Sequence, residues 1–261
     1  MSARTTSCAC RTTTVAPEAG VPGLALEVLQ SNSQVRAARR RLKRNALSFV
    51  RPAWRTWLAR HGFARDGFAI GDHIKSWDVA RTAEFIAAHV PKDEPVLDIG
   101  AFASEIPPIL HRMGYRRVCG VDLNPRIVDM PFAGAIDYRV GDFLRAPYAD
   151  KMFAAVTAIS VIEHGFDGER LAAEVHRLLR PGGFFVASFD YWPEKIPTDG
   201  IRMFDMSWTI FSRGDVEAFV ATAGRHGLSP FGVMHFDAAS RPVTCAGKGY
   251  TFAWLVLQRH R

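Results

Sequence analysis

The chain has 261 residues, a formal net charge of +7 and 48% hydrophobic residues. This length accommodates one large α/β domain with a small accessory segment, and it can bury a substantial core. No apolar run reaches the roughly 18 residues that a membrane-spanning helix requires, so we expect no transmembrane segment and a cytoplasmic location. The four cysteines lack the spacing of a disulfide framework or a metal site, and we expect neither.

Positive charge is concentrated at the amino-terminal end. The first 75 residues carry 13 Lys and Arg against four Asp and Glu, whereas the remaining residues carry 20 against 22. Residues 1–22 are rich in Thr, Ser, Ala and Pro without periodicity, which predicts a disordered tail. Residues 23–75 form a basic segment, in which the apolar residues between 24 and 50 recur at a loosely helical spacing. A second short helix is expected around Trp54 and Trp57.

The cations of this segment are densest between Arg36 and Arg44. Two interpretations are open. A helix with this composition commonly presents a solvated basic face, which we favour, but it also suits an anionic partner such as a glycan, a lipid head group or a nucleic acid.

From residue 76 onward, apolar runs typical of buried strands alternate with helical stripes. Helices are predicted over residues 77–90 and 168–179, and the Ser212 capping box starts another. A long apolar strand is predicted over residues 250–257. This alternation predicts an α/β domain over residues 76–261 with a mostly parallel sheet.

Acidic residues stand at the ends of the predicted strands. Asp98 precedes Gly100, Asp122 ends the next strand, and Asp142 follows the third. Because the carboxyl ends of parallel strands meet at one edge of a sheet, these carboxylates can surround a ligand there. Asp98 and Asp122 have a second interpretation, because an Asp at a strand end also caps the following helix.

Five segments, taken in order, resemble the class I S-adenosylmethionine-dependent methyltransferases over roughly residues 76–258. They contain Asp98-Ile99-Gly100, Asp122, Gly141-Asp142-Phe143, Glu163-His164 and Pro181-Gly182-Gly183. The resemblance implies a Rossmann-like methyltransferase fold. It would have a seven-stranded, mostly parallel sheet, an antiparallel last strand and an N-terminal helical segment. It also implies S-adenosyl-L-methionine as methyl donor and S-adenosyl-L-homocysteine as product.

The resemblance also implies roles for individual residues. In the family, the first acid and glycine lie beside the methionine half of the cofactor, the second acid holds the ribose hydroxyls, and the third reaches the adenine amino group. Carboxylate oxygens suit these hydroxyl and amine donors. The implied cofactor-binding residues are Asp98, Gly100, Ala101, Asp122, Leu123, Asp142, Phe143 and Ser160. Phe102 and Ser104 replace the family's repeated glycines, so we expect this loop to follow a different path around the cofactor.

Catalytic candidates follow the fourth and fifth strands. His164 is the leading candidate for a general base, because an imidazole titrates near neutrality. In the family this His can instead close the cofactor pocket, which leaves Glu163 and Asp190 as further candidates. Residues 190–208 are rich in aromatic and acidic side chains and are expected to form a substrate lid. No ligand spacing requires a metal.

The favoured acceptor is a small polar molecule, with O-methylation of a sugar, glycan or natural-product hydroxyl. Ser160-Val161-Ile162-Glu163-His164 lacks the Asn-Pro-Pro-Tyr type of turn, and the catalytic region is nearly neutral, so we expect no nucleic-acid partner there. A small-molecule N-methyltransferase and a non-catalytic regulatory protein that binds S-adenosylmethionine are alternatives. A nicotinamide-dependent oxidoreductase would need Gly-x-Gly-x-x-Gly, whereas Gly100 stands alone.

Overall fold

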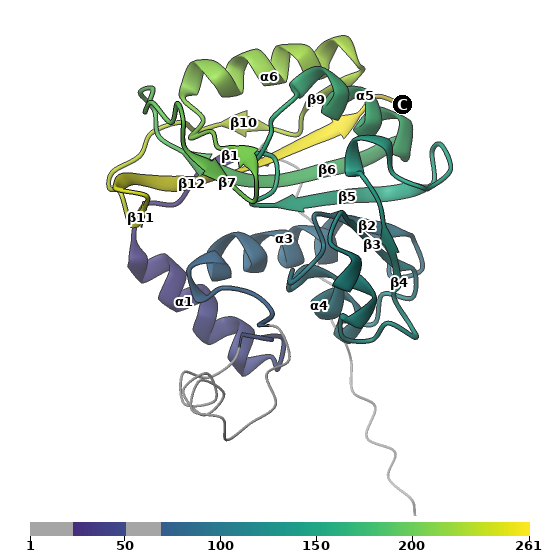
Figure 1. Ribbon diagram of the computed structural model, residues 1–261. Coiled ribbons are helices and arrows are strands. Elements are labelled where there is room, and N and C mark those ends of the chain that lie inside the picture. Colours follow the sequence, from purple (N-terminus) through teal and green to yellow (C-terminus); the bar gives the residue numbers. More distant parts are fainter. Residues whose placement is uncertain (1–22, 51–68) are drawn as a thin grey trace, which may run out of the picture.

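The computed structural model describes residues 23–50 and 69–261 and shows helices on both faces of one large twisted sheet (Figure 1). The tail predicted for residues 1–22 lies outside the described residues. The same holds for the helix predicted around Trp54 and Trp57. No helix within the described ranges is long and apolar enough to cross a membrane.

Five parallel strands form the centre of the sheet in the order β4-β3-β2-β5-β6. Apart from β4 at the edge, which is exposed, their apolar runs are buried on both sides, as is typical of parallel strands covered by helices. These strands confirm the predicted mostly parallel sheet, and their bounds are β2 Val96–Ile99, β3 Val118–Asp122, β4 Asp137–Val140, β5 Phe153–Ile159 and β6 Leu179–Tyr191.

The last long strand, β12 (Lys248–Arg259), is antiparallel to β6, as predicted. The described sheet has ten strands rather than the expected seven, because three short strands pair with β12 and a fourth, β10, pairs with β1. They are β1 Leu24–Val28, β9 Leu228–Pro230, β10 Val233–Met234 and β11 Val243–Cys245. A separate hairpin joins β7 (Arg202–Met203) to β8 (Met206–Ser207).

The helical interpretation of the segment that begins at Leu24 is wrong for its first residues. Residues 24–28 form β1, which pairs antiparallel with β12 so that Leu26 lies opposite Leu255. An apolar run this short does not distinguish a strand from a helix by its spacing. Pairing with β12 satisfies backbone groups that a strand edge would otherwise leave open, and it places Ala25 and Leu26 in the core.

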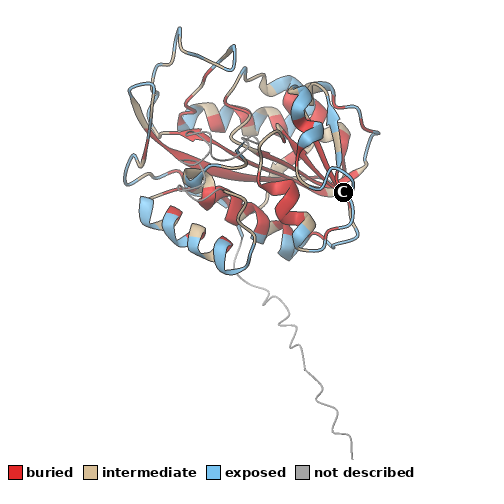
Figure 2. Cartoon of the chain, turned by 60° about the horizontal axis from the view of Figure 1, so that its bottom comes forward, coloured by how far each residue is buried: buried red, intermediate tan, exposed pale blue. Residues whose placement is uncertain are grey.

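Helices cover the two faces in separate layers (Figure 1). One hydrophobic core joins the sheet to α5 and α6, and another joins its opposite face to α1, α3 and α4. Figure 2 shows their buried sides turned toward the sheet and their exposed sides toward solvent. The helix bounds are α1 Asn32–Arg44, α3 Ser76–His89, α4 Ile106–Arg112, α5 Gly168–Leu178 and α6 Arg213–Arg225.

Local capping explains where two of these helices begin. The Asp167 carboxylate accepts a hydrogen bond from the Arg170 amide ahead of α5. Ser212 and Asp215 form the expected capping box ahead of α6. Single-turn 3-10 helices also follow polar caps, and their bounds are η1 His73–Lys75, η2 Pro125–Asp129 and η3 Phe143–Arg145.

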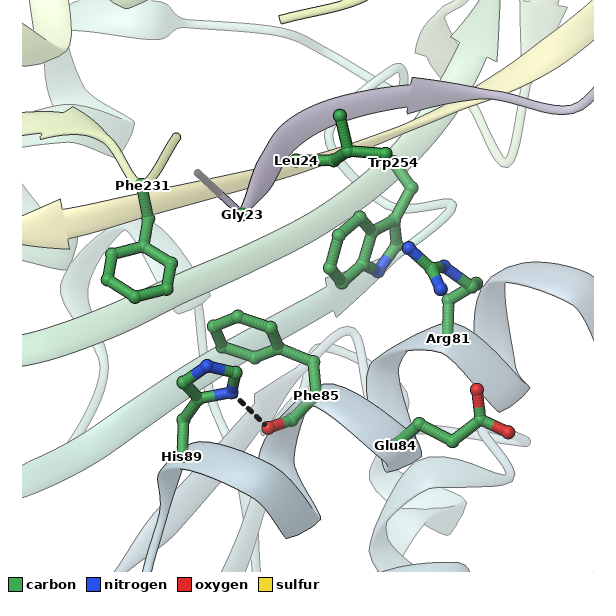
Figure 3. A pocket seen from close by; sticks show the side chains of 8 residues that line it. All are labelled: Gly23, Leu24, Arg81, Glu84, Phe85, His89, Phe231 and Trp254. Carbon is green, nitrogen blue, oxygen red and sulfur yellow. Dashed lines mark hydrogen bonds between the residues drawn. The ribbon is translucent and has the colours of Figure 1, made fainter. Parts of the chain in front are cut away.

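The amino-terminal elements are fastened to α3. Arg81 of α3 pairs with Glu27 of β1, and Arg41 of α1 pairs with Glu84. Figure 3 shows a pocket of about 270 Å³ beside these contacts, with Phe85 of α3 facing Trp254 of β12. The outer face of α1 exposes a row of cations comprising Arg36, Arg40, Lys43 and Arg44. An anionic partner for this face stays a prediction.

If β1 belongs to the sheet, truncating its buried side should destabilise the whole fold. Leu26→Ala should lower the free energy of unfolding by about 2–5 kcal/mol, because it leaves a cavity in the core. Leu24 is the first residue of the same strand and is 39% exposed. Leu24→Ala should therefore change the free energy of unfolding by less than about 0.5 kcal/mol. Urea unfolding of both variants measures the difference, and equal effects would contradict the placement of β1.

Candidate active site

Asp98 lies at the carboxyl end of β2 and is only 1% exposed. The Thr157 hydroxyl of the adjacent strand β5 donates a hydrogen bond to its Oδ1 at 2.5 Å. Its Oδ2 has no hydrogen-bond partner within the described residues. Burial raises the pKa of Asp98 to about 7. The buried oxygen at this edge is therefore suited to a cationic or hydrogen-bond-donating ligand group.

Gly100 turns the chain away from β2. Its φ of +67° lies in the left-handed region, and an added Cβ would come within 2.3 Å of the Val161 side chain. The following residue, Ala101, is fully buried and donates its amide to the Val121 carbonyl at 3.1 Å. Only glycine fits this turn, which brings the backbone close to the segment that follows β5.

Asp122 anchors the loop in which Phe102 and Ser104 replace the family's glycines. Its Oδ2 accepts a hydrogen bond from the Phe102 amide at 3.0 Å, and its Oδ1 accepts one from the Asn124 amide at 2.8 Å. Each carboxylate oxygen can accept more than one hydrogen bond, so these contacts leave acceptor capacity for a ligand. The neighbouring Leu123 side chain is exposed at the same strand end.

Asp142 follows β4 and caps η3 by accepting a hydrogen bond from the Leu144 amide at 2.8 Å. It lies close to Asp122, since the Gly141 amide donates to the Asp122 carbonyl at 2.9 Å. Phe143 is partly buried against the core. The sheet thus brings the predicted donor-side acids Asp98, Asp122 and Asp142 to one edge.

Ser160 follows β5 with an unusual φ of +53°. Its amide donates to the Ser188 carbonyl of β6 at 2.9 Å, and its buried hydroxyl has no partner in the part of the chain that the structure describes. A non-glycine residue in this conformation is strained, and such strain is commonly found at functional sites.

His164 lies on the cofactor side of this edge. It lines a small cavity together with Phe143 and Leu144, and the ring of Phe204 meets it edge-on at 5.1 Å. Burial lowers its pKa, and the nearby Asp190 carboxylate opposes that shift. The two roles that the sequence left open, general base and closure of the cofactor pocket, both stay predictions.

Glu163 and Asp190 lie on the other side of the edge, where they are 1% and 4% exposed. The indole of Trp208 donates to Asp190 Oδ2 at 2.8 Å. Glu163 Oε2 and Asp190 Oδ1 have no hydrogen-bond partner among the described residues. Burial raises the pKa of Glu163 well above its ordinary value, and the nearby Asp190 carboxylate adds a smaller effect in the same direction.

The sequence analysis did not identify two residues near the candidate site, Lys75 at the end of η1 and Asp78 in α3. Lys75 Nζ lies 3.6 Å from Asp190 Oδ1 and 3.4 Å from the centre of the Phe252 ring. Asp78 is fully buried and accepts a hydrogen bond from the Ser188 hydroxyl at 2.8 Å. Burial raises the pKa of Asp78 to about 6, although Lys75 opposes the shift. The sequence signal that could have pointed to Asp78 is its position as an acid within the apolar stripe of residues 77–90.

The segment predicted as a substrate lid is docked on the catalytic candidates. The Gly165 amide donates to the Ser207 carbonyl, and the Thr209 amide donates to the Glu163 carbonyl, both at 2.9 Å. The tip of the β7–β8 hairpin carries Phe204, which is 79% exposed. In the described ranges, no group of three or more His, Cys, Asp or Glu side chains is arranged to hold a metal ion.

A family model described as "Methyltransferase domain" matches residues 97–187. Residues 97–187 of this chain carry a methyltransferase domain. The match runs from the strand that ends in Asp98 to the strand that leads to Asp190, so it includes Asp122, Asp142 and His164 as well. The resemblance stated from the sequence is confirmed.

Two curated relatives match the methyltransferase domain. One is the ubiquinone/menaquinone biosynthesis C-methyltransferase UbiE of Desulfotalea psychrophila, 34% identical over 110 residues that cover 40% of this chain and 45% of that protein. The other is the demethylmenaquinone methyltransferase of Deinococcus radiodurans, 35% identical over 122 residues that cover 43% of this chain and 48% of that protein. The matched part of the chain thus spans less than half the length of either relative.

Solved structures show the same fold over a larger share of the chain. The [4+2]-cyclase SpnF superposes with a TM-score of 0.55 at 15% identity, covering 75% of this chain and 85% of that one. The geranyl diphosphate C-methyltransferase of Streptomyces coelicolor A3(2) superposes with a TM-score of 0.51 at 18% identity, covering 74% and 86%. These superpositions confirm the Rossmann-like methyltransferase fold.

The raised pKa of Asp98 predicts how the stability of the methyltransferase domain depends on pH. The folded state holds the Asp98 proton up to about pH 7, whereas the unfolded chain releases it near pH 4, so this residue's contribution to stability falls as pH rises between the two. Asp98→Asn should remove that fall. Its stability relative to wild type should therefore increase from pH 4 to pH 7 and then level off.

Denaturant unfolding at a series of pH values measures this difference. Asp93→Asn, an exposed substitution in the loop before β2, controls for the loss of one carboxyl group. A constant difference between Asp98→Asn and wild type across this range would contradict the burial of an uncompensated acid.

Proposed function

We propose that this chain is a methyltransferase that uses S-adenosyl-L-methionine and releases S-adenosyl-L-homocysteine. The observation that carries the proposal is the buried Asp98 carboxyl beside the side-chain-free Gly100, since one of its oxygens makes no hydrogen bond of standard geometry with the described residues. The methionine ammonium of the donor suits this oxygen. The bound donor supplies a methyl group on a positively charged sulfur.

The remaining donor contacts follow from the same edge. Asp122 is proposed to hold the ribose hydroxyls with the acceptor capacity that its backbone contacts leave. Asp142 is proposed to accept from the adenine amino group, with Phe143 and His164 beside the ring. Ala101, Leu123 and Ser160 supply the backbone around the donor. The family match supports these roles because it includes all of these positions.

The acceptor is proposed to be a small molecule with a hydroxyl group. Support comes from the buried polar atoms of Glu163 and Asp190, which are suited to a polar acceptor rather than a wholly apolar one. A sugar or glycan acceptor has weaker support, because Trp208 and Tyr250 are buried and offer no exposed face for a sugar ring. One relative is named as a C-methyltransferase, which makes a carbon atom the second candidate for the methylated position.

Isothermal titration calorimetry with S-adenosyl-L-homocysteine tests donor binding. Asp122→Ala should weaken binding by roughly 1–3 kcal/mol, because it removes hydrogen bonds to the ribose. Asp137→Ala, an exposed acid in β4, should leave the affinity unchanged. If the wild-type protein shows no heat of binding at millimolar ligand, the proposed function is wrong.

His164→Ala separates the two roles of this side chain. If it closes the cofactor pocket, the variant should bind the donor a few-fold to about 10-fold more weakly, because a ring contact contributes about 0.5–1.5 kcal/mol. Its kcat should stay within a few-fold of wild type. A loss of about 100-fold in kcat with unchanged donor affinity, together with a changed pH profile, would instead identify His164 as the general base.

A further inference from the structure

The polar group formed by Lys75, Asp190 and Trp208 has no part in the proposed donor contacts. Its members come from three separate parts of the chain: the end of η1, the end of β6 and the segment after β8. Asp190 lies two residues beyond Ser188, whose carbonyl accepts the hydrogen bond from the Ser160 amide. The group therefore adjoins the carboxyl edge on the side away from Asp122 and Asp142.

Lys75 and Asp190 lie close together without a direct hydrogen bond. Lys75 Nζ and Asp190 Oδ1 are 3.6 Å apart, which is longer than a direct charge-assisted hydrogen bond of about 2.7–2.9 Å. Two charged groups at this separation are commonly bridged by a hydroxyl. A hydroxyl oxygen can accept from the ammonium while its proton is donated to the carboxylate.

The neighbouring side chains fix both partners. Trp208 occupies Asp190 Oδ2, and the Tyr250 hydroxyl lies close enough to this carboxylate to interact with it. No hydrogen bond of standard geometry reaches Asp190 Oδ1 from the described residues. Phe252 lies beneath the ammonium at 3.4 Å, and cation–π attraction holds it there. Tyr250 packs edge-on against Trp208 with ring centres 5.7 Å apart. The pair is thus held in an aromatic frame.

The charge of the surroundings bears on the acceptor's class. Among the described residues, the titratable groups near the Lys75–Asp190 pair include Glu163, Asp78, His164 and Tyr250. Burial favours the neutral form of each, because it raises the pKa of the three acids and lowers that of the imidazole. The pair itself has no net charge. The group therefore suits a neutral hydroxyl better than a cationic amine.

We propose that Asp190 is the general base for an aromatic or enolic hydroxyl and that Lys75 binds the oxygen of that hydroxyl; this inference rests on the proposed function. A carboxylate is a weak base, so it suits a phenol, with a pKa of about 10, better than an alkyl alcohol. The lysine ammonium stabilises the negative charge that develops on the oxygen as the proton leaves.

The proposed step transfers the methyl group from the donor sulfur to the acceptor oxygen. The acceptor O–H proton passes to Asp190 Oδ1, and a lone pair of the oxygen forms a bond to the methyl carbon. The carbon–sulfur bond breaks, and its electron pair stays on sulfur. The positive sulfonium becomes a neutral thioether, while the Asp190 carboxylate becomes a carboxylic acid and later releases its proton to solvent.

Binding of simple probes tests this assignment without knowledge of the natural acceptor. Calorimetry in the presence of saturating S-adenosyl-L-homocysteine would compare 4-methylphenol with benzylamine. The phenol should bind saturably and benzylamine should not. Lys75→Met and Asp190→Asn should each weaken phenol binding about 10-fold or more, since each removes a charge-assisted hydrogen bond. Lys75→Arg should weaken it less, because it keeps the charge.

Lys92→Met and Asp93→Asn are matched controls, because both side chains are exposed in the loop before β2. They should leave phenol binding unchanged. Affinity for S-adenosyl-L-homocysteine should stay within a few-fold of wild type in all variants, which shows that they fold. With 4-methylphenol as methyl acceptor, Asp190→Asn should also lower kcat by roughly 100-fold, as expected for a general base.

Three results would overturn the inference: no saturable phenol binding to the wild-type protein, phenol binding by Lys75→Met and Asp190→Asn as tight as that of wild type, or a preference for benzylamine. Each leaves the proposed function intact as long as S-adenosyl-L-homocysteine binds. Failure of the wild-type protein to bind S-adenosyl-L-homocysteine is a different result, and it would reject the proposed function itself.

Discussion

The register of four parallel strands determines where every functional side chain of this protein lies. Asp98 of β2 is paired with Gly120 of β3 and Thr157 of β5, and Ile159 of β5 is paired with Ser188 of β6. A slip of one residue would turn each side chain to the opposite face of the sheet. The hydrogen bond from Thr157 to Asp98 and the approach of β6 toward Lys75 both depend on this register.

The site is electrostatically costly for the fold. Asp78, Asp98, Glu163 and Asp190 are all buried, and burial of a carboxyl group destabilises its charged form. Asp78, Asp98 and Asp190 each accept a side-chain hydrogen bond, from Ser188, Thr157 and Trp208 respectively. Asp78 also accepts one from the Val79 amide, and Asp190 lies beside Lys75. Acids with perturbed pKa values at one sheet edge are typical of functional sites. The proposed donor and acceptor would supply further hydrogen bonds to these buried carboxyl groups.

Local patterns in the sequence were sufficient for much of the fold. The helix starts at Asp167 and Ser212 depend on capping residues that lie within three positions of their partners, and the strand ends at Asp98 and Asp122 depend on apolar runs. Strand β1 was not predictable in this way, because Leu26 finds its partner Leu255 near the other end of the chain. Apolar spacing carries no information about such a partner.

The donor side of the site was predicted better than the acceptor side for the same physical reason. Asp98, Asp122 and Asp142 each follow a strand, so their meeting at one edge is implied by any parallel sheet. Lys75 meets Asp190 only because η1 and the start of α3 pack against the ends of β6 and β12. The sequence also left His164 with two roles, and its contacts with Phe143 and Phe204 depend on how the β7–β8 hairpin docks. A crystal structure of the protein with S-adenosyl-L-homocysteine is the most direct test of the central claim. The account predicts the amino group of the ligand at Asp98 Oδ2 and its ribose at Asp122, whereas ligand bound elsewhere, or an empty edge at saturating ligand, would contradict it.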